Sequence, residues 1–126
     1  MLARYHMRRG KPPEVAGIRQ DTRKHTRHCL RPTNEMVGKY MTEATSYPWA
    51  LFERDYFDLL ECRFTTNRRP FDQLADLARE NDVYIGCSCP TAKNPDVYHC
   101  HTVLALQFME KHYPSLTVVF PRHSPL

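Results

Sequence analysis

The feature that most constrains the fold is a short, almost continuously apolar run at residues 83–87, Val-Tyr-Ile-Gly-Cys, which follows the polar turn residues 80–82. A run of this length without polar alternation is typical of a strand buried on both faces, as strands in parallel sheets are. Residues 101–113 then carry apolar side chains at helical spacing. A buried strand followed by a helix predicts an α/β fold, here a small three-layer Rossmann-like domain with a short, mainly parallel sheet covered by helices.

Other segments supply further strands and helices. Residues 3–8 alternate between apolar and polar side chains, which predicts a half-buried strand. The run Pro32-Thr33-Asn34 predicts a helix start, and Pro48 fits the first turn of a second helix. We expect a third helix after the break at residues 67–70 and a last strand at residues 116–120. Residues 14–31 are polar and weakly periodic, so we expect a long loop there with one helical turn at most.

Length and composition limit the class of protein. A chain of 126 residues is long enough for one domain with a core and too short for two. No apolar run approaches the roughly 18 residues that span a bilayer, and the first residues lack the apolar core of a signal peptide. We therefore expect a cytoplasmic protein without a membrane partner. We expect one domain over residues 1–126, with a basic N-terminal segment (1–32) and a core (33–121).

The net charge of +4 is distributed unevenly. Residues 1–32 carry nine lysines and arginines against two acidic residues, for a net charge of +7, whereas the rest of the chain is at −3. A basic segment beside an acidic body is one way to build a patch for nucleic acid or a phosphate-bearing ligand. The same pattern also describes a solvated face whose arginines pair with that body.

A cluster of cysteines and histidines identifies the candidate site. Cys87, Cys89 and Cys100, with His99 and His101, lie within fifteen residues of one another, between the predicted buried strand and the next helix. Open parallel sheets bind ligands beyond the carboxyl ends of their strands, where this loop falls. The chain has five cysteines, an odd number, and their spacing is unlike that of a secreted disulfide scaffold. Reduced thiols, a metal site or a catalytic thiol are therefore expected.

One hypothesis makes Cys100 a reactive thiol. A cysteine at a helix N-terminus feels the positive end of the helix dipole, which favours the thiolate, and His99 or His101 would take the proton. The candidate catalytic residues are then Cys100, His101 and His99. A phosphatase loop is excluded because it needs an arginine six residues after the cysteine, where Leu106 stands. The structural alternative is that Cys100 is simply a small buried residue at the helix start.

A second hypothesis is zinc binding by Cys87, Cys89, Cys100 and His101, with His99 as an alternative fourth ligand. The one-residue spacing of Cys87 and Cys89 opposes this, since an extended strand sends the two side chains to opposite faces. Both thiols reach one ion only if the strand ends at Cys87 and the chain turns at Pro90. A third hypothesis is redox chemistry, with a Cys87–Cys89 disulfide or with Cys100 resolving one of them, although the usual two-residue redox spacing is absent.

Several segments, taken in order, resemble the YeaO-like family, known as domain of unknown function four-eight-eight. They are Leu-Arg-Pro-Thr-Asn-Glu-Met at residues 30–36 followed by Lys39-Tyr40, the aromatic helix from Trp49 to Leu60, and the strand at residues 83–87 followed by Cys100-His101. The Cys87-x-Cys89 doublet is similar to a related group that pairs Cys-Trp-Cys with a downstream Cys-His. The resemblance covers roughly residues 30–121. It implies a compact α/β fold with a site at the strand ends.

The sequence departs from the family's Cys-His-Arg helix start, because Thr102 stands in place of the arginine. We expect Arg23, Arg27 or Arg31 to fold over the site and replace it, since guanidinium groups bind phosphate and carboxylate in a bidentate manner. The candidate ligand-binding residues are therefore Cys87, Cys89, Arg27 and Arg31. Two functions remain: a cysteine-centred ligand or active site for an anionic, nucleotide-like ligand, and a non-catalytic module that binds zinc or nucleic acid.

Overall fold

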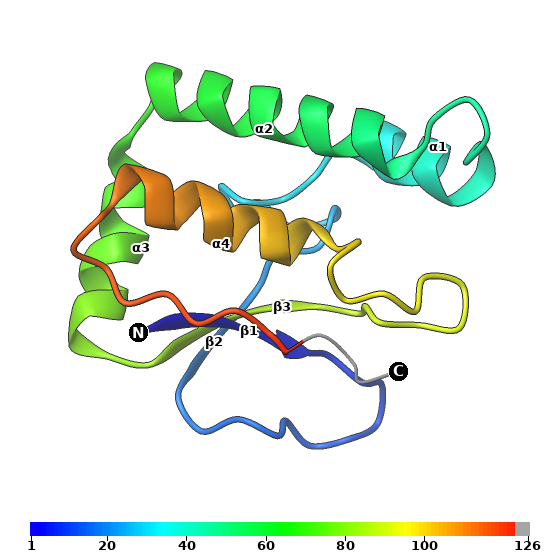
Figure 1. The fold of residues 1–126 in the computed structure, drawn as a ribbon. Helices are drawn as coiled ribbons and strands as arrows, with labels where there is room; N and C mark the ends of the chain where they lie inside the picture. The colour runs from blue at the N-terminus through cyan, green and yellow to red at the C-terminus, as the bar shows by residue number, and fades with distance from the viewer. Residues whose placement is uncertain (123–126) are drawn as a thin grey trace.

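The fold is built on one small parallel sheet (Figure 1), and the structure, a computed structural model, describes residues 1–122. Within them the elements in chain order are β1 (Leu2–His6), β2 (Ile18–Asp21), α1 (Asn34–Thr42), α2 (Trp49–Thr66), α3 (Arg69–Glu80), β3 (Val83–Cys87) and α4 (His101–His112). The strand order is β1-β3-β2, and β3 pairs parallel to both neighbours. The predicted α/β class with a short parallel sheet is confirmed.

The helices and the sheet form layers. Helix α4 packs on β1 and β3, and α2 packs on α4, so that the layers run sheet, α4, α2 (Figure 1). Helix α1 packs against α2. Among residues 1–122, no helix has both the length and the apolar character needed to cross a membrane.

The position of β3 at the centre of the sheet explains why its sequence lacks polar alternation. It is hydrogen-bonded on both edges, and Val83 and Ile85 are fully buried. Gly86 lets two side chains pack closely over the strand, since a Cβ at this position would lie 2.6 Å from the Tyr5 ring and 2.8 Å from the Met7 sulfur. The strand therefore ends with small or apolar side chains and delivers Cys87 at its carboxyl end.

The predicted helix starts are confirmed. The Thr33 hydroxyl caps α1 by accepting a hydrogen bond from the Met36 N–H at 3.1 Å. Pro48 is the residue immediately before the first turn of α2, and α3 begins at the predicted break with Pro70 in its first turn. Helix α4 begins directly after Cys100.

Two predictions about strands are wrong. The segment expected to be a loop contains β2, which is recruited by backbone bonds such as Ile18 N–H to the Asp82 carbonyl at 2.9 Å. Its sequence, Ile-Arg-Gln-Asp, carries a single apolar side chain, so no apolar pattern marks it. The predicted last strand at residues 116–120 forms only an isolated bridge between Leu2 and Val118. This segment runs along the outer edge of β1 without continuous pairing.

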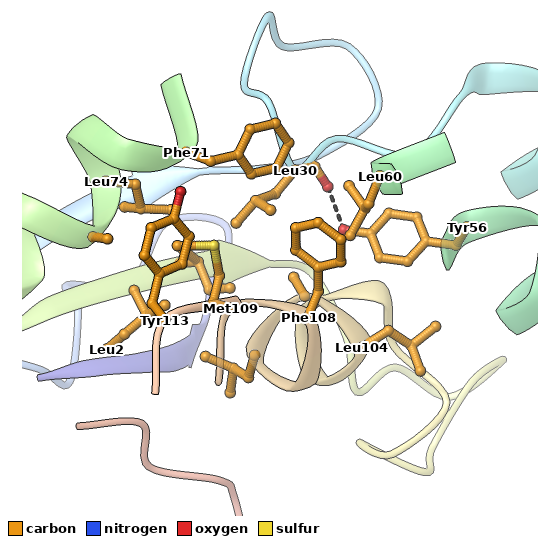
Figure 2. Packing of buried hydrophobic residues seen from close by; sticks show 14 of the residues in the cluster. Leu2, Leu30, Tyr56, Leu60, Phe71, Leu74, Leu104, Phe108, Met109 and Tyr113 are labelled. Carbon is orange, nitrogen blue, oxygen red and sulfur yellow. Dashed lines mark hydrogen bonds between the residues drawn. The ribbon is translucent and has the colours of Figure 1, made fainter. Parts of the chain in front are cut away.

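The hydrophobic core lies between the sheet and the two helical layers. Figure 2 shows buried side chains from every layer meeting there, among them Leu2, Leu30, Tyr56, Leu60, Phe71, Leu104 and Phe108. Leu2 and Leu30 belong to the basic segment 1–32, which is therefore part of the folded body. The fully buried Tyr56 ties that segment to α2, because its hydroxyl donates to the Leu30 carbonyl at 2.5 Å.

We expect Tyr56→Phe to lower the free energy of unfolding by about 1–3 kcal/mol, since the buried Leu30 carbonyl loses its donor. Tyr47→Phe is the matched control: its hydroxyl donates to Asp55, a carboxylate that water also reaches, so the loss is smaller. Urea unfolding measures both values. Equal losses in the two variants would contradict a special role for the Tyr56 bond.

Candidate metal centre and ligand cavity

The candidate site lies at the carboxyl edge of the sheet. The register pairs His6 with Cys87 and Asp21 with Gly86, so all three strands end at this edge. Residues that directly follow the strands therefore meet here: Arg23 after β2, and Cys89 after β3. Cys100, the N-cap residue of α4, lies at the same edge. This is the position at which open parallel sheets bind ligands.

Three cysteine sulfurs converge at this edge. The Sγ atoms of Cys87, Cys89 and Cys100 all lie within 4.8 Å of one another. Cys87 and Cys100 are buried, at 8% and 2% exposure, and Cys89 is half-buried. Cys87 and Cys89 can face the same point because β3 ends at Cys87. Cys89 lies beyond the strand, and its side chain turns back towards Cys87.

The three thiols share their protons unequally. Hydrogen bonds from the Cys100 and Cys87 side chains hold the pKa of Cys89 far below its usual value. Hydrogen bonds with the Cys100 and Cys89 side chains, together with burial, raise the pKa of Cys87. Cys87 acts to lower the pKa of Cys100, but the Cys89 side chain and burial outweigh it, so the pKa of Cys100 is raised. Contacts among the three thiols therefore favour the thiolate form at Cys89 and disfavour it at Cys87 and Cys100.

Three polar side chains support the cluster. The Asn94 amide donates to Cys89 Sγ at 3.4 Å and to the His99 carbonyl at 2.6 Å. The Thr102 hydroxyl donates to Cys100 Sγ at 3.2 Å. Arg4, from β1, donates to the Thr102 hydroxyl at 2.8 Å and to the Cys89 carbonyl at 2.6 Å. These donors stabilise negative charge on sulfur and fix the loop relative to α4.

His101 lies outside the sulfur cluster, although the sequence analysis proposed it as a ligand or a base. Its Nε2 lies 2.9 Å from the Thr22 hydroxyl, which itself donates to the Gly86 carbonyl at 3.0 Å. Since a hydroxyl has one hydrogen to donate, His101 Nε2 must be the donor in this pair. Burial lowers the pKa of His101 to about 4. His101 is thus neutral at pH 7 and engaged with Thr22 at the end of β2.

His99 forms part of a cavity instead. Its ring stacks on Trp49 at a centroid distance of 4.9 Å, and its Nε2 lies 3.8 Å from Asp96. The cavity has a volume of about 330 Å³. The three cysteines and His101 line part of it. Aromatic rings form another part of the lining, namely those of Tyr40, Trp49, Phe52 and His99. The basic residues of the lining are Arg23, Lys24 and His25. The cysteine cluster therefore borders a hollow large enough for a small molecule.

Three arginines of the basic segment (1–32) lie at two different cavities. Arg23 lines the cysteine cavity, where its guanidinium donates to both carboxylate oxygens of Asp21. Arg27 and Arg31, predicted to bind ligand at the cysteines, line a different cavity beside α2 and α3. The guanidinium that reaches position 102 belongs to Arg4.

Sequence reasoning missed Arg4 and Asn94. Arg4 occupies a strand position where a basic residue is expected to face solvent, and Asn94 lies in a polar loop. The buried state of Asn94, with 6% exposure, is unusual for asparagine, but only the structure reveals it. The only signal in the sequence was Thr102, two positions after Cys100, where the arginine of the resembling family is absent and another residue could supply the donor.

Comparison with protein-family models, with curated proteins and with solved structures finds no match to this chain. The resemblance to the YeaO-like family therefore stays a prediction that rests on the order of its motifs.

His28, in the loop after β2, is held by hydrogen bonds that depend on its protonation state. His28 Nδ1 accepts a hydrogen bond from the Leu30 N–H at 3.1 Å, and its Nε2 lies 2.6 Å from the Gln20 side-chain oxygen. A proton on Nδ1 would break the first of these bonds. Burial lowers the pKa of His28 to about 4 from its ordinary value of 6.5. The unfolded chain therefore takes up this proton at a higher pH than the folded protein does.

The stability due to neutral His28 is complete above pH 6.5 and is lost as the pH falls towards 4. We expect a decrease of about 2 kcal/mol in the free energy of unfolding across this window from His28. In His28→Gln the decrease between pH 7 and pH 4.5 becomes smaller, whereas the exposed His25→Gln control keeps the parent's dependence. Urea unfolding at both pH values measures the free energy of unfolding. If His28→Gln loses as much of it between pH 7 and pH 4.5 as the parent does, His28 is not the source of the pH dependence.

Proposed function

We propose that this protein is a metal-dependent ligand-binding domain, in which Cys87, Cys89 and Cys100 hold one Zn²⁺ ion and a small ligand occupies the adjoining cavity. The observation that carries the proposal is the convergence of the three sulfurs within 4.8 Å. Tetrahedral zinc with Zn–S bonds of about 2.3 Å separates its sulfurs by roughly 3.8 Å, so binding needs only a small inward movement.

The chemistry of the donors supports zinc. Thiolates are soft ligands that favour Zn²⁺ over Mg²⁺ or Ca²⁺. The remaining thiol protons must leave when the metal binds, and a divalent cation supplies the charge that makes their departure favourable. Arg4, at the Cys89 carbonyl, would then offset part of the net negative charge of a tris-thiolate zinc site, and the Asn94 amide would stabilise the Cys89 sulfur by a hydrogen bond.

Three protein ligands leave a fourth position open. Closed four-ligand zinc sites are typical of structural sites, whereas three ligands with an exchangeable fourth are typical of sites that bind or transform small molecules. The metal-ligating group within the described residues consists of the three cysteines, without a histidine. Because these cysteines also line the cavity, the open position would face that space.

Burial argues against Cys100 as a nucleophile. At 2% exposure and with a raised pKa, it lacks the exposed thiolate that reactive cysteines need. A ligand role uses the same sulfur without requiring it to reach a substrate. The metal proposal thus accounts for all three cysteines together.

We expect the purified protein to bind one equivalent of Zn²⁺. Cys89→Ser removes the half-buried ligand and should weaken zinc affinity at least ~100-fold, beyond the effect typical of losing a supporting residue. Cys62→Ser is the matched control, because Cys62 is exposed and lies outside the cluster. Competition against a chromophoric chelator measures affinity, and circular dichroism verifies folding. Equal zinc binding by Cys89→Ser and the parent would refute the site; a disulfide among the three cysteines without zinc would favour redox chemistry.

The open fourth position can be tested separately. We expect the Co²⁺-substituted protein to show thiolate charge-transfer bands, and its visible d–d bands to shift when azide or imidazole is added. Trp49 is the only tryptophan of the chain and lines the cavity, so its fluorescence should change in the same titration. Cobalt bands that do not respond to either probe would indicate a closed site and contradict the ligand-binding part of the proposal.

A further inference from the structure

A second cavity, of about 410 Å³, lies beside the end of α2 and the start of α3. Three arginines line it: Arg27 and Arg31 from the basic segment, and Arg63 from the last turn of α2. Its other lining residues are Cys29, Cys62, Thr66, Asn67, Pro70 and Phe71, none of which is acidic. This cavity shares no residue with the cysteine cavity.

Two of the arginines are held in place by the backbone. Arg63 Nη1 donates to the Cys29 carbonyl at 3.0 Å and to the Arg31 carbonyl at 2.6 Å. Arg31 Nη1 donates to the His28 carbonyl at 3.0 Å. Each side chain uses one nitrogen in this way, and its remaining N–H groups make no hydrogen bond to another residue among 1–122. The guanidinium groups are thus positioned before any ligand arrives, which reduces the entropic cost of binding.

The charge of these arginines is not compensated. Five other arginines of residues 1–122 pair with carboxylates, namely Arg8 with Glu14, Arg23 with Asp21, Arg54 with Asp55, Arg68 with Asp72 and Arg79 with Asp76. Arg27, Arg31 and Arg63 have no such partner in the described part of the chain. Burial and the nearby charge of Arg31 lower the pKa of Arg63, as expected for like charges brought together.

We propose that this cavity binds a phosphate group. A tetrahedral phosphate offers several oxygens and a charge of −1 to −2, which suits three guanidinium forks better than the two oxygens of a carboxylate do. The Thr66 hydroxyl and the Asn67 amide also line the cavity and supply uncharged polar groups. The phosphate comes from one of two sources, a small phosphorylated molecule or the backbone of a nucleic acid. The proposal is independent of the metal centre.

The test uses calorimetric titration of the full chain with inorganic phosphate, and with a single-stranded 12-nucleotide DNA that has no terminal phosphate. We expect saturable binding of one phosphate per chain. Arg27→Gln and Arg31→Gln should each weaken it about tenfold or more, because each removes a charge-assisted hydrogen bond. Arg31→Lys keeps the positive charge but loses the paired N–H donors of the guanidinium group, so it should weaken phosphate binding by a smaller factor.

Arg9→Gln is the matched control: Arg9 is an exposed arginine of the same basic segment that does not line the cavity. It should leave phosphate affinity unchanged within a factor of two. If DNA binds more tightly than phosphate and competes with it, the source is a nucleic-acid backbone; if phosphate alone binds, the source is a small molecule. Absence of saturable binding to both probes, or an equal loss in Arg9→Gln and Arg27→Gln, would overturn the proposal.

Discussion

The pairing of β3 on both of its edges is the constraint on which the rest of the structure depends. This strand has neighbours on either side, so its backbone is hydrogen-bonded on both edges, and Val83 and Ile85 are fully buried. This position explains the apolar sequence, and the glycine at position 86 lets the Tyr5 ring and the Met7 sulfur pack closely over the strand. Because the strand stops at Cys87, the next residues are free to turn back, and Cys89 joins the same cluster.

The cysteine cluster in turn depends on contacts between distant parts of the chain. Arg4 from β1 contacts both the loop after β3 and the first turn of α4, at the Cys89 carbonyl and at Thr102. Asn94 fixes the loop from within by bonding Cys89 Sγ and the His99 carbonyl. These two residues hold the three sulfurs together without taking part in the cluster. Such supporting contacts are what make a thiol group a defined site.

Much of the architecture was predictable because it follows from local patterns. The caps at Thr33 and Pro48 and the apolar spacing of α4 each depend on residues a few positions apart. The edge strand β2 was not predictable in this way. It carries a single apolar side chain and exists because the open edge of β3 offers hydrogen-bonding partners. The segment at residues 116–120 is the opposite case: its β-branched sequence predicts a strand, but it forms only an isolated bridge beside β1.

The sequence by itself determined where the site is, because a strand that ends at Cys87 and a helix that starts after Cys100 must place their termini at one edge of a parallel sheet. Only the tertiary structure decided its composition. It brought Cys89 to the cluster, engaged His101 with Thr22, and moved Arg27 and Arg31 to a separate cavity. The physical reason is that ligand sets and charge clusters depend on distances through space. Those distances are set by how layers pack, whereas sequence patterns report only neighbours along the chain.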